Sequence, residues 1–477
     1  MSMTSALNNA LSGLSAVSRS AQLVSSNIAN ALTPGYGKRD LLQTSSVFGG
    51  VQVDGVRRAV NPAILSDRRL AQAEVAQGAV SVGYLEKLQS LLGAPDETGA
   101  LTSRLATFEG RLVEAASRPD SSTRLQAVVD GAKDLVARVN SIGAGIQAER
   151  QAADRAIARD VDTLNVTLAQ IYKLNSAIAR TSDLTPGASA LMDQRQVLID
   201  RLADIVPLRQ IPRDRGVVAL MTTGGQILLD SKAAQIEFTQ ANAITPGMSA
   251  AGGQLSGLTI NGQAVTMGNG AGRMEGGRLA ANFELRDSIA PQSQADLDAF
   301  ARDLIQRFEL PGLDPTRAVG DAGLFTDAGA PLAVAPAEGV AQRLTFNALA
   351  DPAEGGLVMR LRDGLGAASV GAEGNARLLQ ALSDTLAAPR ATVFGVDGSA
   401  SDYATELLSR TGGALFRAEH SQTFSQNRAN ALRAQELGEG VDTDQEMGKL
   451  LLVEQSYAAN ARVIQVVDDM MRRLLEI

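Results

Sequence analysis

Few residues in this chain could do chemistry. His420 is the only histidine, and it lies between Glu419 and Ser421 in a polar stretch. A general base needs a nucleophile and an orienting partner within hydrogen-bond distance. No HExxH, Walker A or GxSxG stretch occurs in the sequence. We therefore interpret His420 as a solvated residue of a polar helix, and we predict no catalytic site, no metal and no bound cofactor.

The acidic run at residues 442–446 could be a metal loop or a helix start. Its carboxylates resemble the beginning of a calcium loop, but the third oxygen ligand, the central Gly and the distant Glu are missing. Thr443 followed three residues later by Glu446 is the pattern of a capping box. We predict a helix start here. Because the chain has no cysteine, disulfides and thiolate metal sites are also excluded.

Length and composition favour a multidomain helical protein. At 477 residues the chain should form two to four domains. Aromatic residues make up 3%, Trp is absent and the net charge is −8 without a basic tract, which argues against nucleic-acid binding. No apolar run reaches membrane-spanning length, and no cleavable signal begins the chain. On these rules alone the protein would be cytoplasmic.

Two helices at opposite ends of the chain carry the heptad pattern that must position any functional surface. In each, apolar residues recur at steps that alternate between three and four, as in helices that pack against one another. The N-terminal seam is Leu7, Ala10, Leu14, Val17, Ala21, Val24 and Ile28. The C-terminal seam is Leu450, Val453, Tyr457, Asn460, Ile464, Val467, Met471 and Leu474. A single Asn in such a seam often sets register. We predict that the two helices pair, so that the chain leaves and returns to one place.

The N-terminal helix should end in a defined turn. Asn27 and Asn30 precede Pro34, Gly35 and Tyr36. Asn tolerates the left-handed position at a helix end, and the residue before a proline is steered away from helix. Pro-Gly suits the central pair of a type II turn.

These two ends resemble the terminal signatures of the rod, hook and hook-associated proteins of the bacterial flagellum. The N-terminal segment is Asn-Ile-Ala-Asn at 27–30 with Thr-Pro-Gly-Tyr at 33–36, and the C-terminal segment is 457–464. Gly37 departs from the Ser or Thr expected after the Tyr. A helix around 191–196 and segments at 285–287, 294–308 and 323–325 further resemble the hook-associated protein 1 family.

The resemblance implies a secreted structural protein, exported without a cleaved signal through a type III channel to the hook–filament junction. Its partners would be a ring of identical subunits, the hook protein, a second junction protein or the filament, and an export chaperone at the C-terminal helix. The residues listed in both seams, together with the turn at 27–36, would form the assembly interface. The chain would bind neither cofactor nor nucleic acid and would not span a membrane.

The predicted fold is a multidomain α+β arrangement with paired terminal heptad helices, a long helical-bundle shaft and a β-rich central insertion. We predict a terminal coiled-coil domain (1–60 with 438–477), a shaft domain (61–205 with 375–437) and a β-rich outer domain (206–374, including a helix at 294–308). Within the insertion we expect hairpins at 217–229 and 259–265 and strands at 343–346 and 356–361, because β-favouring residues there flank Gly-containing turns.

Three alternatives remain at this stage. Another axial protein, of the rod or hook, would share both signatures but lack the helical block at 61–205. A cell-wall hydrolase would need a catalytic carboxylate or nucleophile. A coiled-coil adhesin would lack the turn signature at 27–36.

Overall fold

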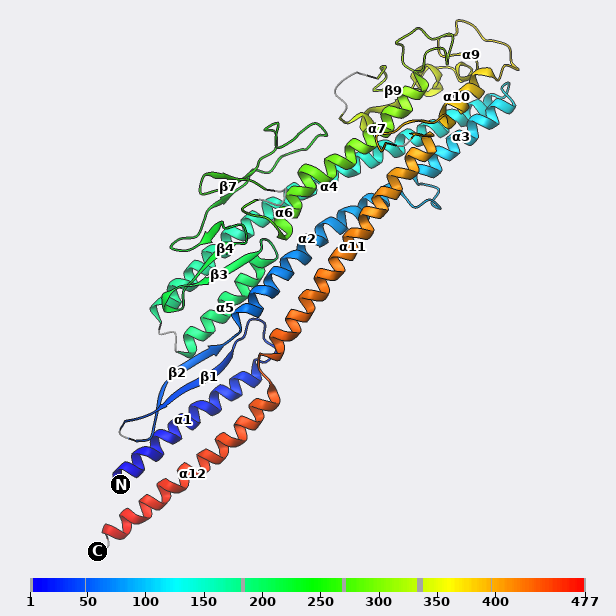
Figure 1. Ribbon diagram of the computed structural model, residues 1–477. Helices are drawn as coiled ribbons and strands as arrows, with labels where there is room; N and C mark the ends of the chain where they lie inside the picture. The colour runs from blue at the N-terminus through cyan, green and yellow to red at the C-terminus, as the bar shows by residue number, and fades with distance from the viewer. Residues whose placement is uncertain are drawn as a thin grey trace.

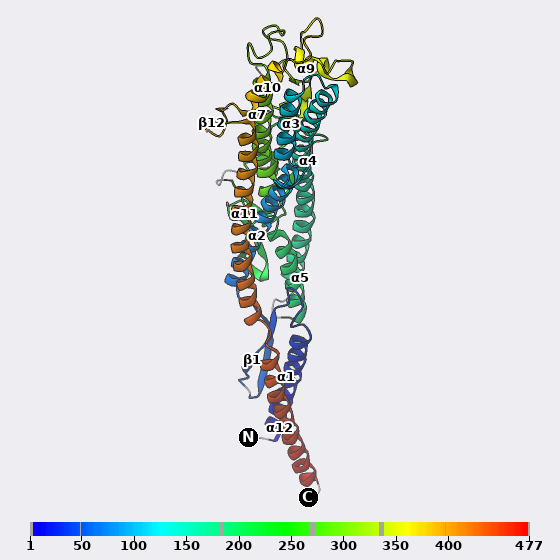
Figure 2. The same ribbon diagram turned by 90° about the vertical axis from the view of Figure 1, so that its right-hand side faces the viewer.

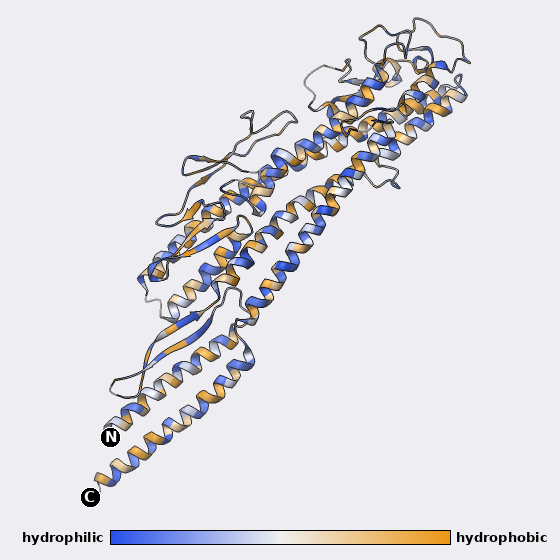
Figure 3. Ribbon diagram, in the orientation of Figure 1, coloured by the Kyte–Doolittle hydropathy of each residue, from blue (hydrophilic) through white to orange (hydrophobic). Residues whose placement is uncertain are grey.

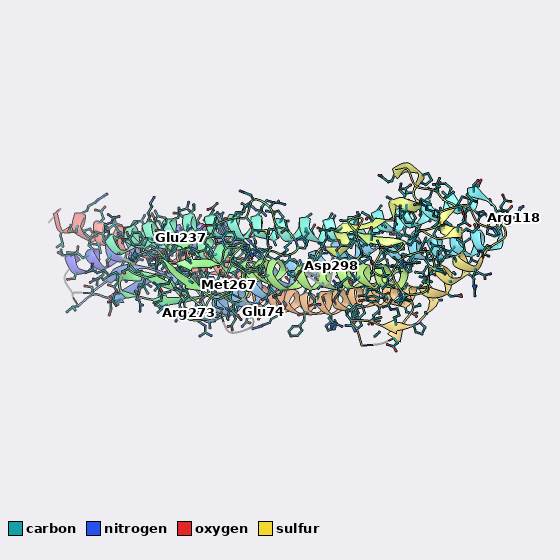
Figure 4. The ribbon with its side chains drawn as sticks, turned by 90° about the horizontal axis from the view of Figure 1, so that it is seen from above. Glu74, Arg118, Glu237, Met267, Arg273 and Asp298 are labelled. Carbon is teal, nitrogen blue, oxygen red and sulfur yellow. The ribbon has the colours of Figure 1, made fainter. Side chains whose placement is uncertain are left out.

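The chain forms an elongated molecule that starts at one end, turns at the other and returns (Figure 1). The structure is a computed structural model that describes residues 3–47, 49–181, 185–267, 272–332, 338–395 and 397–475. Both termini lie at the same end, and the helices run along the long axis in both side views (Figures 1 and 2). Seen from above, Arg118 marks the end farthest from the termini (Figure 4). This course is the excursion predicted from the two terminal heptad helices.

A terminal unit sits at the end of the molecule that holds both termini. It consists of α1 (Met3–Ala29), a hairpin of β1 (Lys38–Ser45) and β2 (Val51–Ala59), and α12 (Thr443–Leu475). The hairpin is antiparallel, and both it and α12 pack on α1. The hairpin follows directly after the turn that ends α1.

Long helices build the shaft. These are α2 (Pro62–Leu92), α3 (Leu101–Ser117), α4 (Ser122–Arg180), α5 (Pro186–Ala203), α6 (Gly277–Glu284), α7 (Ala290–Phe308), α10 (Arg377–Ala387) and α11 (Ala400–Gly438). A π-helical turn, η2 (Leu285–Ile289), joins α6 to α7. Local sequence sets the helix starts: the Asn61 side chain accepts hydrogen bonds from the first backbone amides of α2, and Ser121 does the same for α4.

Two apolar cores hold the shaft together. The larger lies around α3, α4, α7, α10 and α11, where the rings of Phe108, Phe308 and Phe325 meet edge to face at 5.2–6.4 Å between centroids. The smaller joins α4 and α5 to the short strands through residues such as Leu164 and Leu220. Each core gives the shaft stability that is separate from the terminal unit.

Small antiparallel sheets and short helices pack along the shaft. The strands are β3 (Leu208–Pro212), β4 (Val218–Thr222), β5 (Ile227–Leu229), β6 (Ile236–Glu237), β7 (Leu258–Ile260), β8 (Gln263–Val265), β9 (Phe325–Asp327), β10 (Leu344–Phe346), β11 (Arg390–Ala391) and β12 (Asp397–Gly398). The short helices are η1 (Asp214–Gly216), α8 (Val340–Arg343), η3 (Ala348–Ala350), η4 (Pro352–Glu354) and α9 (Arg360–Asp363). Sheets β3-β4-β5 and β6-β7-β8 have three strands each, and the remaining pairs have two.

The predicted hairpins are confirmed and one predicted strand is wrong. β4 pairs with β5, and β7 pairs with β8 through Asn261 and Gly262, whose φ angles of 52° and 77° fit a type I′ turn. The expected strand at 356–361 does not form, because α9 begins at Arg360. The fully buried Arg362 in α9 pairs with the adjacent Asp363 at 2.7 Å and donates to the carbonyl of Pro119.

The helices α6 and α7 belong to the packing of the shaft. Both contact α4, and α6 also contacts α2, so only the strands and loops of the central insertion lie outside the helices. Buried Asp298 of α7 accepts hydrogen bonds from the amides of Gly339 and Ala341, which ties a distal loop to the shaft. Among the described residues, no helix is long and apolar enough to cross a membrane.

Candidate assembly site at the paired terminal helices

The helices α1 and α12 lie side by side and antiparallel at the end of the molecule (Figures 1 and 2). Of the predicted seam residues, Ala10, Val24 and Val467 are buried in the single chain. The half-buried seam residues are Leu7, Leu14, Val17, Ile28, Leu450, Val453, Asn460 and Ile464. Tyr457 and Met471 remain about half exposed, at 50% and 47%. The structure therefore brings the two seams together but leaves part of α12 uncovered.

The two helices approach closely at Gly13. A Cβ atom at this position would lie 3.0 Å from Nδ2 and 3.1 Å from Oδ1 of Asn460. Asn460, the polar residue of the C-terminal seam, therefore packs against Gly13, the one glycine of α1. A larger residue at position 13 would force the Asn460 side chain to shift.

Asn27 is the polar centre of the terminal unit. It is 1% exposed, and its amide uses its full hydrogen-bonding capacity. Oδ1 accepts from the Tyr36 hydroxyl at 2.9 Å and from the Arg39 amide at 3.0 Å. Nδ2 donates to the Arg39 carbonyl at 3.0 Å and to Glu446 Oε2 at 2.9 Å. One side chain therefore connects the end of α1, the start of β1 and the first turn of α12.

The start of α12 corrects the predicted capping box. Asp442 is the residue that accepts hydrogen bonds from the amides of Asp444 and Gln445, at 2.9 and 3.1 Å. Glu446 turns away from the helix end and bonds Asn27 instead. The predicted capping box does not form for two reasons. Asp442, one residue earlier, caps the helix equally well, and the buried Asn27 amide competes for the Glu446 carboxylate.

The Glu446 carboxylate is buried but compensated. Its side chain is fully shielded from solvent, and Lys449 lies 2.7 Å and Lys38 3.7 Å from Oε1. Burial acts to raise the pKa of Glu446. The hydrogen bonds from Asn27 and Lys449 and the two lysine charges outweigh burial, so the pKa is held below its ordinary value of 4.5. The carboxylate is therefore charged at neutral pH.

The predicted turn after α1 is present and has a defined backbone. The side-chain amide of Asn30 donates to the Ser26 carbonyl at 2.9 Å, and the Tyr36 amide donates to the Thr33 carbonyl at 3.1 Å. Gly35, which follows Pro34, has a φ of +78°, as the third residue of a type II turn requires.

Asp193 of α5 ties this turn to the shaft. Its carboxylate accepts from the Gly37 amide at 3.0 Å, from Arg39 at 3.0 Å and from Arg58 Nε at 2.6 Å. Arg58 also donates to the Gly35 carbonyl and to Gln196. A Cβ at position 37 would lie 2.5 Å from Arg58 Nε, which explains the Gly in place of the expected Ser or Thr.

A second apolar stripe on α12 was missed in the sequence. Four apolar side chains outside the seam are 43–63% exposed: Leu452, Val463, Val466 and Met470. With Ser456 and Ala459 they again follow steps of three and four, which is the signal that could have revealed them. We call these six residues the outer stripe. Apolar residues recur along α12 in Figure 3, and a helix with two apolar stripes is suited to more than one neighbour.

His420 lies on the exposed surface of α11, with its ring centroid 6.5 Å from that of Phe416. Asp442, considered as a metal ligand, is used to cap α12. Neither residue is part of the terminal unit's polar network. The functional features of the described residues are therefore the paired helices and the outer stripe.

Comparison with known families agrees with this arrangement. The model described as "Flagellar hook-associated protein FlgK helical domain" matches residues 85–310, which begin in α2 and include α3 to α7. The model described as "Flagellar basal body rod FlgEFG protein C-terminal" matches residues 437–477, which contain α12. Both models describe structural proteins of the bacterial flagellum, and together they match the shaft helices and α12.

Individual relatives are similar to this chain as well. The chain is 29% identical over 244 residues to flagellar hook-associated protein 1 of Salmonella typhimurium, covering 49% of this chain and 44% of that protein. It is 22% identical over 516 residues to flagellar hook-associated protein 1 of Bacillus subtilis, covering 98% of this chain and 97% of that protein. Both relatives are flagellar hook-associated proteins 1, and the second is similar to this chain over nearly its whole length. The matched region thus spans less than half the length of the Salmonella relative.

A solved structure, the flagellar hook junction protein FlgK from Burkholderia pseudomallei, matches 55% of this chain and 47% of its own. The TM-score is 0.45 and the sequence identity is 18%. These values are too low to support an argument about the fold.

Proposed function

We propose that this chain is a structural subunit of the hook–filament junction that assembles through its terminal unit. The observation that carries the proposal is the outer stripe, which leaves apolar side chains of α12 in solvent after α1 has covered the first seam. An exposed apolar surface of this kind marks an interaction site. Covering it would bury apolar area that contributes about 25 cal/mol per Å².

The occupant of the outer stripe is a second copy of this chain. A ring of identical subunits repeats the same surfaces around an axis, so each α12 meets the terminal unit of its neighbour. The hook protein would contact one end of this ring, and a second junction protein or the filament would contact the other. An export chaperone would cover α12 before assembly, because the same apolar surface must be shielded from early association.

The family matches favour the hook-associated class over another rod or hook protein. The rod-type C-terminal model accounts for α12, whereas the helical-domain model accounts for the block that includes α4. Hydrolase and adhesin functions have no comparable support in the comparisons.

A charge in the outer stripe tests the proposal. Val466→Asp places a carboxylate within the outer stripe, and Gln465→Asp places one at the adjacent, exposed polar position. We expect Val466→Asp to retain the helix content of the monomer but to abolish both polymerisation in vitro and recovery of filaments in a complemented strain. Gln465→Asp should assemble normally. Normal assembly of Val466→Asp would refute the proposal.

A further inference from the structure

Two contacts between α1 and α12 differ from the rest of their apolar seam. Asn27 bonds Glu446 at one end of the pair, and Gly13 makes room for Asn460 farther along. Fourteen residues separate the two contacts on α1, and fourteen also separate them on α12. The contacts therefore lie two heptads apart on both helices and belong to one antiparallel register.

The apolar seams do not define this register by themselves. Both repeat every seven residues, so a shift of one heptad again places apolar side chains against apolar side chains. Such a shift moves α12 by about 10 Å along α1. The linker at 439–442 between α11 and α12 can extend to roughly 14 Å, which is longer than this displacement.

We infer that Asn27–Glu446 and Gly13–Asn460 select the register in which the terminal helices pair. A shift of one heptad would move Glu446 away from Asn27 and leave a buried carboxylate without its amide donor, which is costly. The same shift would place Asn460 beside Ser20 or Ala6, whose Cβ atoms occupy the space that Gly13 leaves open. Both contacts are lost together in either direction.

The orientation of the Asn27 side-chain amide is fixed by residues outside α12. Its oxygen is fixed by the Tyr36 hydroxyl and the Arg39 amide, and one of its two N–H bonds is fixed by the Arg39 carbonyl. The other N–H points to a single place, which Glu446 occupies. The turn at 33–36 thus acts through Asn27 as a positioning element for α12. This is a property of one chain and does not depend on assembly.

Disulfide trapping can read the register, because the natural chain has no cysteine. The pairs Asn27–Glu446 and Gly13–Asn460 place Val17 within one residue of Tyr457 in the observed register. Shifts of one heptad bring Val17 level with Leu450 or Ile464. Three full-length chains would each carry Val17→Cys with cysteine at one of these positions. Each would be oxidised briefly as purified monomer, and the cross-linked fraction would be measured by mass spectrometry.

The register contact is then removed in the same three chains. Asn27→Leu with Glu446→Leu replaces the polar pair by apolar residues that still suit a helix pair. Asn8→Leu with Glu454→Leu makes the same changes at exposed positions of the same helices and serves as the matched control. Glu446→Gln keeps a hydrogen-bond acceptor for Asn27 without the charge, and circular dichroism checks that helix content is retained.

When the register contact is intact, and also in the Asn8→Leu/Glu454→Leu control, we expect a cross-link only in the chain whose second cysteine replaces Tyr457. In the Asn27→Leu/Glu446→Leu variant, the cross-linked fraction of the two chains that report a shifted register should rise. It should come within about tenfold of the fraction for the native register, because apolar seams alone differ little in energy between registers. Glu446→Gln should retain the native pattern. Native cross-linking alone in the double variant would overturn the inference. Equal cross-linking of all three chains in the unaltered background would overturn it as well.

Discussion

Asn27→Ala should loosen the terminal unit without unfolding the shaft. The substitution removes all four hydrogen bonds of the Asn27 amide. The buried Glu446 carboxylate and the half-buried Tyr36 hydroxyl both lose their bond to it. A lost buried hydrogen bond costs about 1 kcal/mol, and more when the partner stays buried and unsatisfied. Allowing for the remaining lysines around Glu446, we expect a loss of about 3 kcal/mol in the local opening free energy of α12.

Hydrogen exchange measures this opening directly. A loss of about 3 kcal/mol corresponds to roughly 100-fold faster exchange of the α12 amides. The amides of α4 should keep their rates, because α4 is buried in the two cores of the shaft. Asn8→Ala, at an exposed position of α1, is the matched control and should change neither helix. Less than threefold acceleration in α12, or equal acceleration in α4, would refute the assignment of Asn27 as the polar centre.

Two further predictions concern acid and Gly37. Because the folded pKa of Glu446 lies below the ordinary value of 4.5, its stabilisation is complete above that pH and is lost as pH falls through the lower folded pKa. Exchange protection of α12 should therefore fall in acid, and Glu446→Gln should flatten this dependence; an unchanged slope would contradict the role of Glu446. Gly37→Ser should destabilise the turn by about 1–3 kcal/mol, because its Cβ meets Arg58. Thermal unfolding should show no comparable loss for Gly247→Ser, where nothing lies within 4 Å, and equal effects would exclude the steric explanation.

Two buried carboxyls of the shaft should contribute to its acid response with the opposite sign. Burial raises the pKa of Asp204 and of Asp298, so protonation of these carboxyls relieves an unfavourable buried charge as pH falls. Loss of protection in α12 at a pH where the shaft stays protected would therefore separate the two parts of the molecule. This contrast makes α12, rather than whole-protein stability, the proper readout for Glu446.

The sequence by itself determined the elements that depend on local pattern. A period of three and four, sustained from Leu7 to Ile28 and from Leu450 to Leu474, specifies a helix with an apolar seam, whatever lies elsewhere in the chain. The turn at Pro34 and Gly35 and the hairpin at Asn261 and Gly262 follow from the φ angles that those residues allow. The course of the chain also followed from the sequence, because two matching seams at opposite ends favour pairing of the two end helices.

The tertiary structure alone decided which polar groups meet. Glu446 and Asn27 are 419 residues apart in the sequence. The capping-box pattern considers only nearby residues, so it predicted that Glu446 would cap α12. The strand expected at 356–361 failed for a similar reason, since α9 places the buried Arg362 where it reaches the distant carbonyl of Pro119. Apolar periodicity is a property of each helix, whereas register and polar pairing depend on which helix arrives beside it. Only the folded chain brings Asn27, Gly13, Glu446 and Asn460 into one alignment.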